Sequence, residues 1–262
     1  MKVPTEPVLR ARALGVGYRD RQVIHALDLR IEPGSVTALV GPNGSGKSTL
    51  LHALARVLTP TDGVVELDGT PITSQRSVAV ARRLALLPQS ALAPPGATVT
   101  EVVDQGRYPR TGALGMLRRG PDDAVREALG LTGLEDLART PVAQLSGGQR
   151  QRVWIAMALA QQTDLLLLDE PTTYLDVRHQ LDLMELVVRL RDEQGKTIVM
   201  VLHDLNQAAR HADRIVALRD GRILADGPPA EVLTPRVLHE VFDIDALVLT
   251  DPVTSRPMFV AR

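Results

Sequence analysis

The stretch Val40-Gly-Pro-Asn-Gly-Ser-Gly-Lys-Ser-Thr49 decides how this chain folds, because it matches the pattern G-x-x-x-x-G-K-[ST]. The residues before it, 35–40, are apolar and partly β-branched, which predicts a short buried strand. Leucines follow the motif at helical spacing: Leu50, Leu51, Leu54 and Leu58. Strand, glycine loop and helix therefore come in the order that a phosphate-binding loop requires. The alternative, a Gly/Ser-rich turn that contains a lysine by chance, does not account for the strand and the helix.

Each part of this motif has a role in holding an anion. Glycines let the backbone fold so closely that consecutive N–H groups face one anion. The N-terminus of the following helix adds a partial positive charge, and Lys47 adds a full one. Ser48 lies where its hydroxyl can hold Mg²⁺. We therefore predict a phosphate site at this loop.

Composition restricts both the fold and the partners. The chain has 262 residues, 44% of them hydrophobic, which suits one large α/β domain or a domain with an inserted subdomain. A net charge of −1 excludes a global field that would recruit nucleic acid or an acidic membrane. The absence of cysteine excludes disulfides, zinc–thiolate sites and thiol nucleophiles. Prolines interrupt the uncharged segment 84–100, so we expect a soluble chain that reaches a membrane only through a partner.

Periodicity and turn residues predict further elements of both kinds. Strands are expected at residues 8–32 (two or three strands), 64–67, 84–88, 164–168, 196–202, 215–218, 222–225 and 246–260. Helices are expected at 99–105, 122–129, 134–137, 153–160, 177–191 and 228–241. Between Ser90 and Gln144 the composition changes to loops, with 107–121 loop-rich and basic, and short helices. This change indicates a small helical subdomain inserted in an α/β core.

A second candidate anion site lies at Leu145-Ser-Gly-Gly-Gln-Arg-Gln151, before a largely apolar helix. Ser146 suits the N-cap position, and Gly147 and Gly148 expose backbone N–H groups at the helix start. The alternative is an ordinary helix cap preceded by a flexible turn.

Two carboxylates end the aliphatic run 164–168. Such runs are typical of central parallel strands, and side chains at their C-terminal ends face the ligand crevice. Asp169 can hold Mg²⁺ through its water shell, and Glu170 can polarise a water for attack. The alternative is that this acidic pair merely starts a loop.

Three further side chains are weaker candidates. Gln89, just beyond a strand, could touch Mg²⁺ or the attacking water, or it could be a solvated loop residue. His203 ends a buried strand beside the same crevice, where a histidine without a function would also fit. The ring of Tyr18 could stack on adenine, although taken alone it is an ordinary strand tyrosine.

The order and spacing of these motifs resemble those of the ATP-binding-cassette ATPases over essentially the whole chain. The motifs are the phosphate loop, Gln89, Leu145-Ser-Gly-Gly-Gln149, Leu165-Leu-Leu-Leu-Asp-Glu170, Leu175-Asp176 and His203. Within that family the chain resembles the ATPases of iron–siderophore importers, close to the ferric enterobactin type. That closer resemblance is carried by Gly106-Arg-Tyr-Pro109, Trp154-Ile-Ala-Met157, Asp169 to Asp176, His179-Gln180, Val201 to Gln207 and Asp251-Pro-Val253. Arg110 and Tyr174 depart from the expected pattern.

The resemblance implies a fold, two cofactors and a set of site residues. The fold is α/β, a P-loop NTPase (RecA-like) core with an N-terminal antiparallel β subdomain and an inserted α-helical subdomain. The cofactors are ATP and Mg²⁺. ATP would be bound by Tyr18, Gly41, Pro42, Asn43, Gly44, Ser45, Gly46, Lys47, Ser48, Thr49, Ser146, Gly147, Gly148 and Asp176. Mg²⁺ would be held by Ser48, Gln89 and Asp169, and hydrolysis would depend on Glu170, His203, Lys47 and Gln89.

The resemblance also implies a domain division and partners. One cassette would span 1–262, with a nucleotide-binding core at about 1–88 and 160–245, an inserted subdomain at 89–159 and a tail at 246–262. Two copies would form a head-to-tail homodimer around two ATP molecules. The dimer would lie on the cytoplasmic face of the cell membrane, bound to polytopic permease subunits, indirectly served by an extracytoplasmic substrate-binding protein, and without nucleic acid.

Other functions use similar loops. Haem and cobalamin importers share this architecture, and soluble cassette ATPases act without transport. Chromosome-type ATPases place long coiled coils between the phosphate loop and the Leu-Ser-Gly-Gly-Gln motif. In this chain only about a hundred residues of loop and short helix separate these two motifs. A small-molecule kinase would not need the Leu-Ser-Gly-Gly-Gln motif. The resemblance therefore favours ATP-driven import of an iron(III)–siderophore complex.

Overall fold

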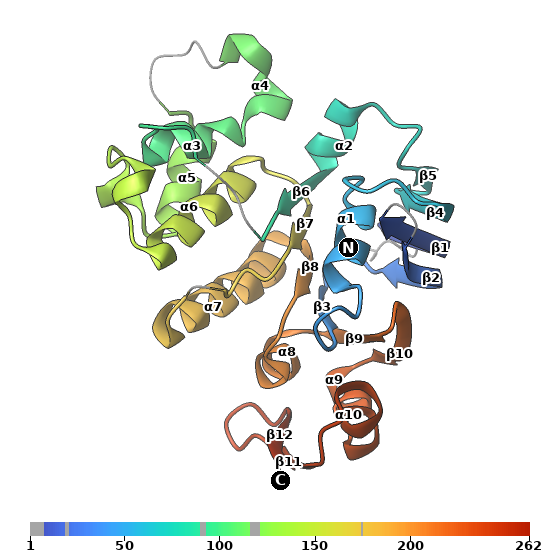
Figure 1. The fold of residues 1–262 in the computed structure, drawn as a ribbon. Coiled ribbons are helices and arrows are strands. Elements are labelled where there is room, and N and C mark those ends of the chain that lie inside the picture. Colours follow the sequence, from blue (N-terminus) through green and yellow to red (C-terminus); the bar gives the residue numbers. More distant parts are fainter. Residues whose placement is uncertain (1–7, 19–20, 90–92, 116–120, 174) are drawn as a thin grey trace. The chain divides into compact units, whose positions relative to one another are not determined.

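The computed structural model describes residues 8–18, 21–89, 93–115, 121–173 and 175–262. The chain divides into two compact units. The first unit comprises the residues up to Gln75 together with Val187–Arg262, and the second comprises Arg76–Leu186. Each unit is described separately below, with its elements labelled in Figure 1.

A largely parallel sheet forms the core of the first unit. β3 (Val36–Val40) lies between β8 (Thr197–Val201) and β9 (Arg214–Arg219), parallel to both, and β10 (Arg222–Gly227) pairs antiparallel with β9. Every residue of β3 and β8 is buried. Burial on both faces explains why these strands read as continuous aliphatic runs in the sequence. α1 (Lys47–Leu54) and α8 (Leu205–His211) follow β3 and β8.

The N-terminal part of the first unit is an antiparallel sheet, as the sequence predicts. Two strands precede β3: β1 (Leu9–Tyr18) and β2 (Arg21–Ile31). β4 (Asp62–Leu67) and β5 (Thr70–Pro71) complete it in the order β2-β1-β4-β5. Its inward residues alternate with exposed ones, which is typical of a sheet with one buried face.

The C-terminal part of the first unit closes on α8. α9 (Pro229–Val232) and α10 (Pro235–Phe242) precede a hairpin of β11 (Ala246–Thr250) and β12 (Pro257–Ala261). The side chain of Asn206 in α8 bonds Phe259 twice, with its amide donating to the carbonyl at 3.2 Å and its oxygen accepting from the backbone N–H at 2.9 Å. The single helix predicted at 228–241 is wrong, because Thr234 caps a second helix and interrupts it.

The second unit combines a pair of parallel strands with short helices. β6 (Leu84–Leu87) and β7 (Leu165–Leu168) pair parallel, and α2 (Ser77–Arg83) leads into β6. The inserted helices are α3 (Val99–Gln105), α4 (Tyr108–Gly115), α5 (Asp123–Leu131) and α6 (Gly147–Ala160), with 3₁₀ turns at Glu135–Leu137 and Val142–Gln144. α7 (Val177–Gln194) begins in the second unit and ends in the first.

The structure differs from the sequence prediction at α1, α2 and α4. The helix after the phosphate loop ends at Leu54 rather than continuing to Leu58, and Arg56 takes a left-handed conformation with φ of 62°. α2 falls where no helix was expected. α4 occupies a segment expected to be loop, and a non-helical Gly112 with φ of 63° interrupts it. Arg110 of α4 donates to the carbonyls of Gln161 and Gln162 at 3.0 and 2.5 Å, so tertiary contacts help to form this helix.

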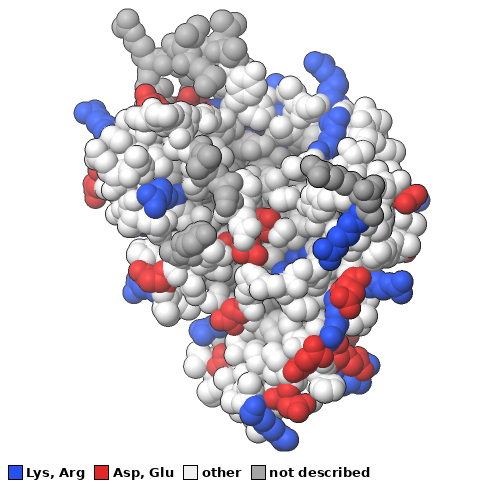
Figure 2. Space-filling view, in the orientation of Figure 1, with Lys and Arg blue, Asp and Glu red and all other residues white. Residues whose placement is uncertain are grey.

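In the described part of the chain, no helix has both the length and the apolar character needed to cross a membrane. Acidic and basic side chains are interspersed over the face shown in Figure 2. This distribution agrees with the net charge of −1.

Candidate functional site

The phosphate loop joins β3 to α1, and its backbone requires glycine at two positions. Gly41 has φ of 152°, and a Cβ there would lie 2.1 Å from the carbonyl oxygen of Leu218. Gly46 has φ of 101°, and a Cβ there would lie 2.7 Å from Cδ1 of Ile24. A side chain at either residue would therefore meet both a clash and a strained backbone. This conformation supports the prediction that residues 41–49 wrap closely around an anion.

Lys47 lies at the N-terminus of α1 with its side chain folded over the loop. It is only 5% exposed, and Nζ donates to the carbonyls of Gly41 at 2.8 Å and Pro42 at 2.9 Å. The loop is closed by a bond from Ser45 N–H to the Pro42 carbonyl at 3.2 Å. A buried ammonium therefore lies against the same short turn that contains the glycines, beside the positive end of α1.

Two other predicted residues of the first unit flank this loop. Tyr18 is the last residue of β1 and is 49% exposed, and its hydroxyl lies 3.5 Å from Oγ1 of Thr49. A half-exposed ring beside the loop suits stacking on a base. His203 follows β8, the parallel neighbour of β3, and Asp204 caps α8. Because β3 and β8 are parallel, their C-terminal ends lie at the same edge of the sheet. The phosphate loop and His203, which follow these strands, therefore lie at that edge.

In the second unit, the two predicted carboxylates follow β7. Asp169 is 1% exposed, and its N–H donates to the carbonyl of Leu87 at 2.9 Å. Glu170 has φ of 50°, a left-handed conformation that is uncommon for a residue other than glycine. The turn continues with a bond from Thr173 N–H to the Glu170 carbonyl at 3.2 Å. An uncommon backbone conformation at this glutamate is a feature often found at functional sites.

The carboxylate of Glu170 accepts hydrogen bonds from the side chains of Gln89 and Thr173. Nε2 of Gln89 donates to Oε2 at 2.7 Å, and Oγ1 of Thr173 donates to the same oxygen at 3.3 Å. The structure thus brings Gln89 and Glu170 together within the second unit. Sequence reasoning missed Thr173, because a threonine three residues after a glutamate gives no signal unless the turn between them is known.

The Leu-Ser-Gly-Gly-Gln motif forms the first turn of α6. Ser146 is the N-cap: its side chain accepts from Gln149 N–H at 3.2 Å, and the Gln149 side chain accepts from Ser146 N–H at 2.9 Å. This reciprocal capping box leaves Gly147 and Gly148 in the first turn, both partly exposed. The predicted helix cap is therefore present. That this helix start binds an anion stays a prediction.

α6 is tied to the turn that follows Glu170. Nε2 of the buried Gln151 donates to the carbonyl of Pro171 at 3.2 Å. A Cβ on Gly148 would lie 3.5 Å from Cδ2 of Leu175. The start of α6 and the turn 170–176 are thus packed together.

Asp176 caps the N-terminus of α7. Its Oδ1 accepts from His179 N–H at 2.9 Å and lies 2.8 Å from Nδ1 of the same histidine. The backbone bond, followed by the side-chain bond, lowers the pKa of the Asp176 carboxyl. Asp176 therefore stays anionic near neutral pH. Tyr174 lies outside the described residues.

The predicted site residues divide between the two units. The first unit holds Tyr18, residues 41–49 and His203, and the second holds Gln89, Ser146, Gly147, Gly148, Asp169, Glu170 and Asp176. In the described part of the chain, no group of three or more His, Cys, Asp and Glu side chains could hold a metal ion alone. The predicted Mg²⁺ ligands are instead a hydroxyl, an amide and a carboxylate, all of them oxygen donors of the kind that Mg²⁺ prefers.

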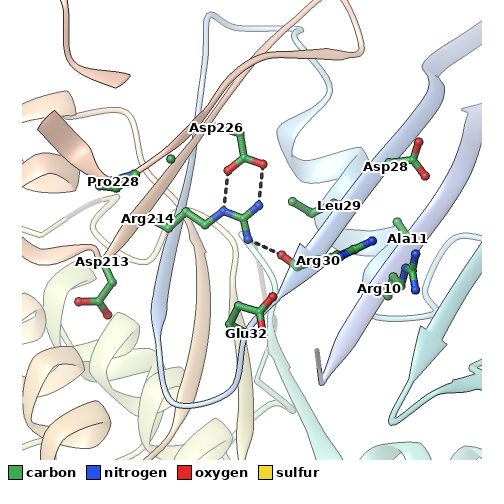
Figure 3. Close-up of a pocket in the computed structure, with 11 residues that line it drawn as sticks. Arg10, Ala11, Asp28, Leu29, Arg30, Glu32, Asp213, Arg214, Asp226 and Pro228 are labelled. Carbon is green, nitrogen blue, oxygen red and sulfur yellow. Dashed lines mark hydrogen bonds and ion pairs between the residues drawn. The ribbon is translucent and has the colours of Figure 1, made fainter. Parts of the chain in front are cut away.

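A recess of about 900 Å³ in the first unit is distinct from the phosphate loop. Figure 3 shows Arg214 directed at the carboxylate of Asp226, with bonds of 2.5 and 2.6 Å, and at the carbonyl of Arg30 at 2.5 Å. None of the residues that line this recess belongs to 41–49.

Comparison with known proteins identifies the family. The family model for ABC transporter matches residues 24–173. The chain is 48% identical over 250 residues to the iron(3+)-hydroxamate import ATP-binding protein FhuC of Bacillus subtilis (strain 168), covering 95% of this chain and 93% of the relative. The chain belongs to the ABC transporter family.

Other ABC transporter proteins match over similar lengths. The chain is 47% identical to the ferric enterobactin transport ATP-binding protein FepC of Escherichia coli (strain K12), covering 98% of this chain and 95% of the relative. A hemin import ATP-binding protein, HmuV of Streptomyces coelicolor, is 45% identical over 98% of this chain and 91% of the relative. Among solved structures, the dimeric bacterial ABC transporter cassette MJ0796 matches with a TM-score of 0.72 at 28% identity, covering 84% of this chain and 98% of that one.

These matches confirm two predictions. The predicted family, the ATP-binding-cassette ATPases, is the family shown. The predicted resemblance to ATPases of iron–siderophore importers is also confirmed, by relatives that are 48% and 47% identical. The predicted fold class, an α/β P-loop core with an antiparallel β subdomain and a helical insert, agrees with the structural neighbours. The chain is an ATP-binding cassette.

Proposed function

We propose that this chain is the ATP-hydrolysing subunit that powers import of an iron(III)–siderophore complex through a membrane permease. The observation that carries this proposal is the 48% and 47% identity, over almost the whole chain, to ATP-binding proteins for ferric hydroxamate and ferric enterobactin. The phosphate loop, the capped Leu-Ser-Gly-Gly-Gln turn and the Glu170 turn supply the matching chemistry.

Hydrolysis proceeds by in-line attack of water on the γ-phosphate. Lys47 and the N–H groups of residues 44–49 neutralise charge on the β- and γ-oxygens. Glu170 accepts the proton of the attacking water or orients it. His203 contacts the γ-phosphate, and the ring of Tyr18 stacks on adenine. The buried ammonium of Lys47 and the exposed ring of Tyr18 support these roles.

Ser48, Gln89 and Asp169 would hold Mg²⁺. All three offer oxygen atoms. The amide nitrogen of Gln89 donates to Glu170, so the amide oxygen would be the atom available to the metal. Asp169, buried at the end of β7, supplies the single negative charge of the set. When bound, Mg²⁺ neutralises charge that develops on the phosphate oxygens.

Two copies of the chain bind head to tail and enclose two ATP molecules. Ser146, Gly147 and Gly148 of one copy complete the γ-phosphate site of the other, and Asp176 lies at the interface between copies. The N-terminus of α6 supports this arrangement, because a capped helix start with two glycines has the backbone N–H groups and the partial positive charge that suit an anion.

The dimer works beneath a permease on the cytoplasmic face of the cell membrane. Polytopic permease subunits contact the cassette near Gln89, and an extracytoplasmic binding protein delivers the chelate. Closure upon ATP binding and reopening after hydrolysis drive the permease between two access states. The division into a core at about 1–88 and 160–245, an insert at 89–159 and a tail at 246–262 belongs to this proposal.

The conservative substitution Glu170→Gln tests the hydrolytic part of the proposal. We expect turnover to fall at least about 100-fold, since a base positioned for proton transfer contributes on that scale. ATP affinity should stay within about two-fold of the wild type, because the amide keeps the shape of the carboxylate. Steady-state ATPase assays and calorimetric titration with ATP measure both quantities. Turnover that stays near the wild-type level would contradict the role of Glu170.

A haem importer is the second candidate, favoured by the 45% identity to a hemin import protein. Growth of a deletion strain on defined iron sources separates the two. Loss of growth on ferric siderophores with normal growth on hemin supports the siderophore assignment, and the reverse pattern supports haem.

A further inference from the structure

We infer that the C-terminal hairpin β11–β12 positions His203 for ATP hydrolysis, and that Asn206 is the residue through which the hairpin acts. His203 lies between β8 and α8, and β12 packs against α8. This inference rests on the proposed contact between His203 and the γ-phosphate. The hairpin then has a function, although none of its residues takes part in the proposed mechanism.

The backbone is fixed by hydrogen bonds on both sides of His203. On the N-terminal side, Leu202 N–H donates to the carbonyl of Leu39 at 3.1 Å, just beyond the paired part of β3 and β8. On the C-terminal side, the carboxylate of Asp204 caps α8 by accepting from two N–H groups of its first turn, at 2.8 and 3.0 Å. The side chain of His203 is exposed between these two points. Its position therefore depends on where the first turn of α8 lies.

α8 is too short to be stable by itself. It has seven residues, whereas an isolated helix needs roughly 12 to 15. Its buried side chains are those of Leu205, Ala208 and Ala209, and each alanine contributes only one methyl group. The position of α8 therefore depends on its contacts with neighbouring elements.

The hairpin forms hydrogen bonds with both ends of α8. In the first turn, the amide of Asn206 donates to the carbonyl of Phe259 at 3.2 Å, and its oxygen accepts from the N–H of the same residue at 2.9 Å. At the other end, Nη1 of Arg256 donates to the carbonyls of Ala209 at 3.3 Å and Ala212 at 2.5 Å. The last carbonyls of a helix have no partner within it, so Arg256 supplies one. Both ends of α8 are thus joined to a single element.

The turn of the hairpin keeps Arg256 in place. Asp251 accepts from Val253 N–H at 2.8 Å and from Oγ1 of Thr254 at 2.7 Å. The N–H of Asp251 donates to the carbonyl of Arg256 at 2.8 Å. Asp251-Pro-Val253 is one of the stretches that carry the resemblance to siderophore-type ATPases, and this turn explains its role. Since a two-stranded hairpin is only marginally stable alone, the hairpin and α8 stabilise each other.

The test is a double-mutant cycle between Asn206 and His203 in the full-length chain. Asn206→Ala removes both bonds to Phe259, His203→Ala removes the proposed contact with ATP, and a third variant carries both substitutions. Val260→Thr is the matched control, because it changes a half-exposed side chain of the same hairpin and keeps the backbone of Phe259. Steady-state kinetics give kcat and KM for ATP. Calorimetric titration with ATP measures the fraction of chains that bind, so that kcat is expressed per binding site.

We expect His203→Ala to lower kcat at least about 100-fold, the scale of one lost donor to a charge that develops in the transition state. Asn206→Ala should lower kcat about five- to ten-fold, the scale of one or two lost hydrogen bonds, with KM changed less than about two-fold. In the His203→Ala background, the same substitution should lower kcat less than about two-fold, because the residue that it positions is absent. Val260→Thr should behave like the wild type.

A purely structural role of Asn206 gives a different result. Loss of folded protein would lower the fraction of chains that bind ATP and leave kcat per binding site unchanged. An unchanged or increased kcat per binding site in Asn206→Ala would therefore overturn the inference. An equal fold-loss with and without His203 would also overturn it, because Asn206 would then act through another residue.

Two further outcomes are separated by the same variants. If Asn206→Ala does not fold, Asn206→Asp takes its place in the cycle, since it keeps the bond accepted from Phe259 N–H and loses the donated one. If His203→Ala itself retains turnover, the proposed contact of His203 with the γ-phosphate fails, and the inference fails with it. If His203→Ala loses turnover and the Asn206 variants do not, only the role of the hairpin fails.

Discussion

At the scale of single residues, Lys47 shows how local sequence determines a site. Its ammonium is buried and bonded to two carbonyls of the loop that it follows, at 2.8 and 2.9 Å. A charge held in this way is already desolvated and positioned before a phosphate arrives. We therefore expect preorganisation to be the main contribution of Lys47 to the binding of phosphate.

Lys47→Ala should weaken ATP binding about 10- to 100-fold, the range expected for the loss of hydrogen bonds from a charged donor. Isothermal titration with ATP measures the effect. Lys196→Ala, a lysine outside the loop, is the control and should bind normally. Wild-type affinity in Lys47→Ala would show that the loop does not hold the phosphates.

At the scale of elements, α6 and α3 begin with the same kind of cap. Ser146 and Gln149 form a capping box on α6, and Thr98 and Glu101 form one on α3. Removing the cap residue costs a helix about 1 kcal/mol in either place. The two helices therefore form a matched pair, of which only α6 is proposed to bind phosphate.

Ser146→Ala and Thr98→Ala should each lower the free energy of unfolding by about 1 kcal/mol in urea titrations. Only Ser146→Ala should also lower the ATPase rate, because its hydroxyl is proposed to contact the γ-phosphate. Equal ATPase rates in the two variants would show that Ser146 only caps α6 and does not contact the γ-phosphate.

His211, at the end of α8, predicts a pH dependence of stability. Burial, followed by the positive charges of Arg210 and Arg256, lowers the pKa of His211 from 6.5 to about 4. The unfolded chain then takes up a proton below pH 6.5 that the folded chain takes up only near pH 4. Stability from this residue is therefore lost as the pH falls through that window, by at most about 2 kcal/mol because the side chain is partly exposed.

Unfolding midpoints at pH 7 and pH 5 measure this dependence. We expect His211→Gln to lose part of the decrease seen in the wild-type chain, since glutamine does not titrate. An identical decrease in both proteins would assign the pH dependence to other groups.

At the scale of the whole molecule, the sequence predicted the elements whose signals are local. The aliphatic strands β3, β7 and β8, the phosphate loop and the capped start of α6 all lie where their motifs placed them. Strands buried on both faces and turns with specific residue requirements can be predicted from the local sequence, without knowledge of the segments that pack against them.

Features set by tertiary contacts could not be read in the same way. α4 has a glycine-rich sequence, and its Arg110 bonds the end of α6, a contact invisible to local periodicity. The hydrogen bond from Thr173 to Glu170 depends on the left-handed turn at Glu170, which the residue types alone do not indicate. The division of α10 from α9 depends on a threonine cap inside a segment that otherwise looks continuous.

We propose that each ATP is held by the phosphate loop of one copy and the Ser146 turn of the other. The chain contains no cysteine, so any disulfide that forms must join introduced cysteines. The measurement is disulfide formation in a chain carrying Asn43→Cys, Ser146→Cys and Glu170→Gln, with and without ATP, on a non-reducing gel. We expect a covalent dimer that forms only with ATP. A disulfide within a single chain, or a dimer formed equally without ATP, would contradict it.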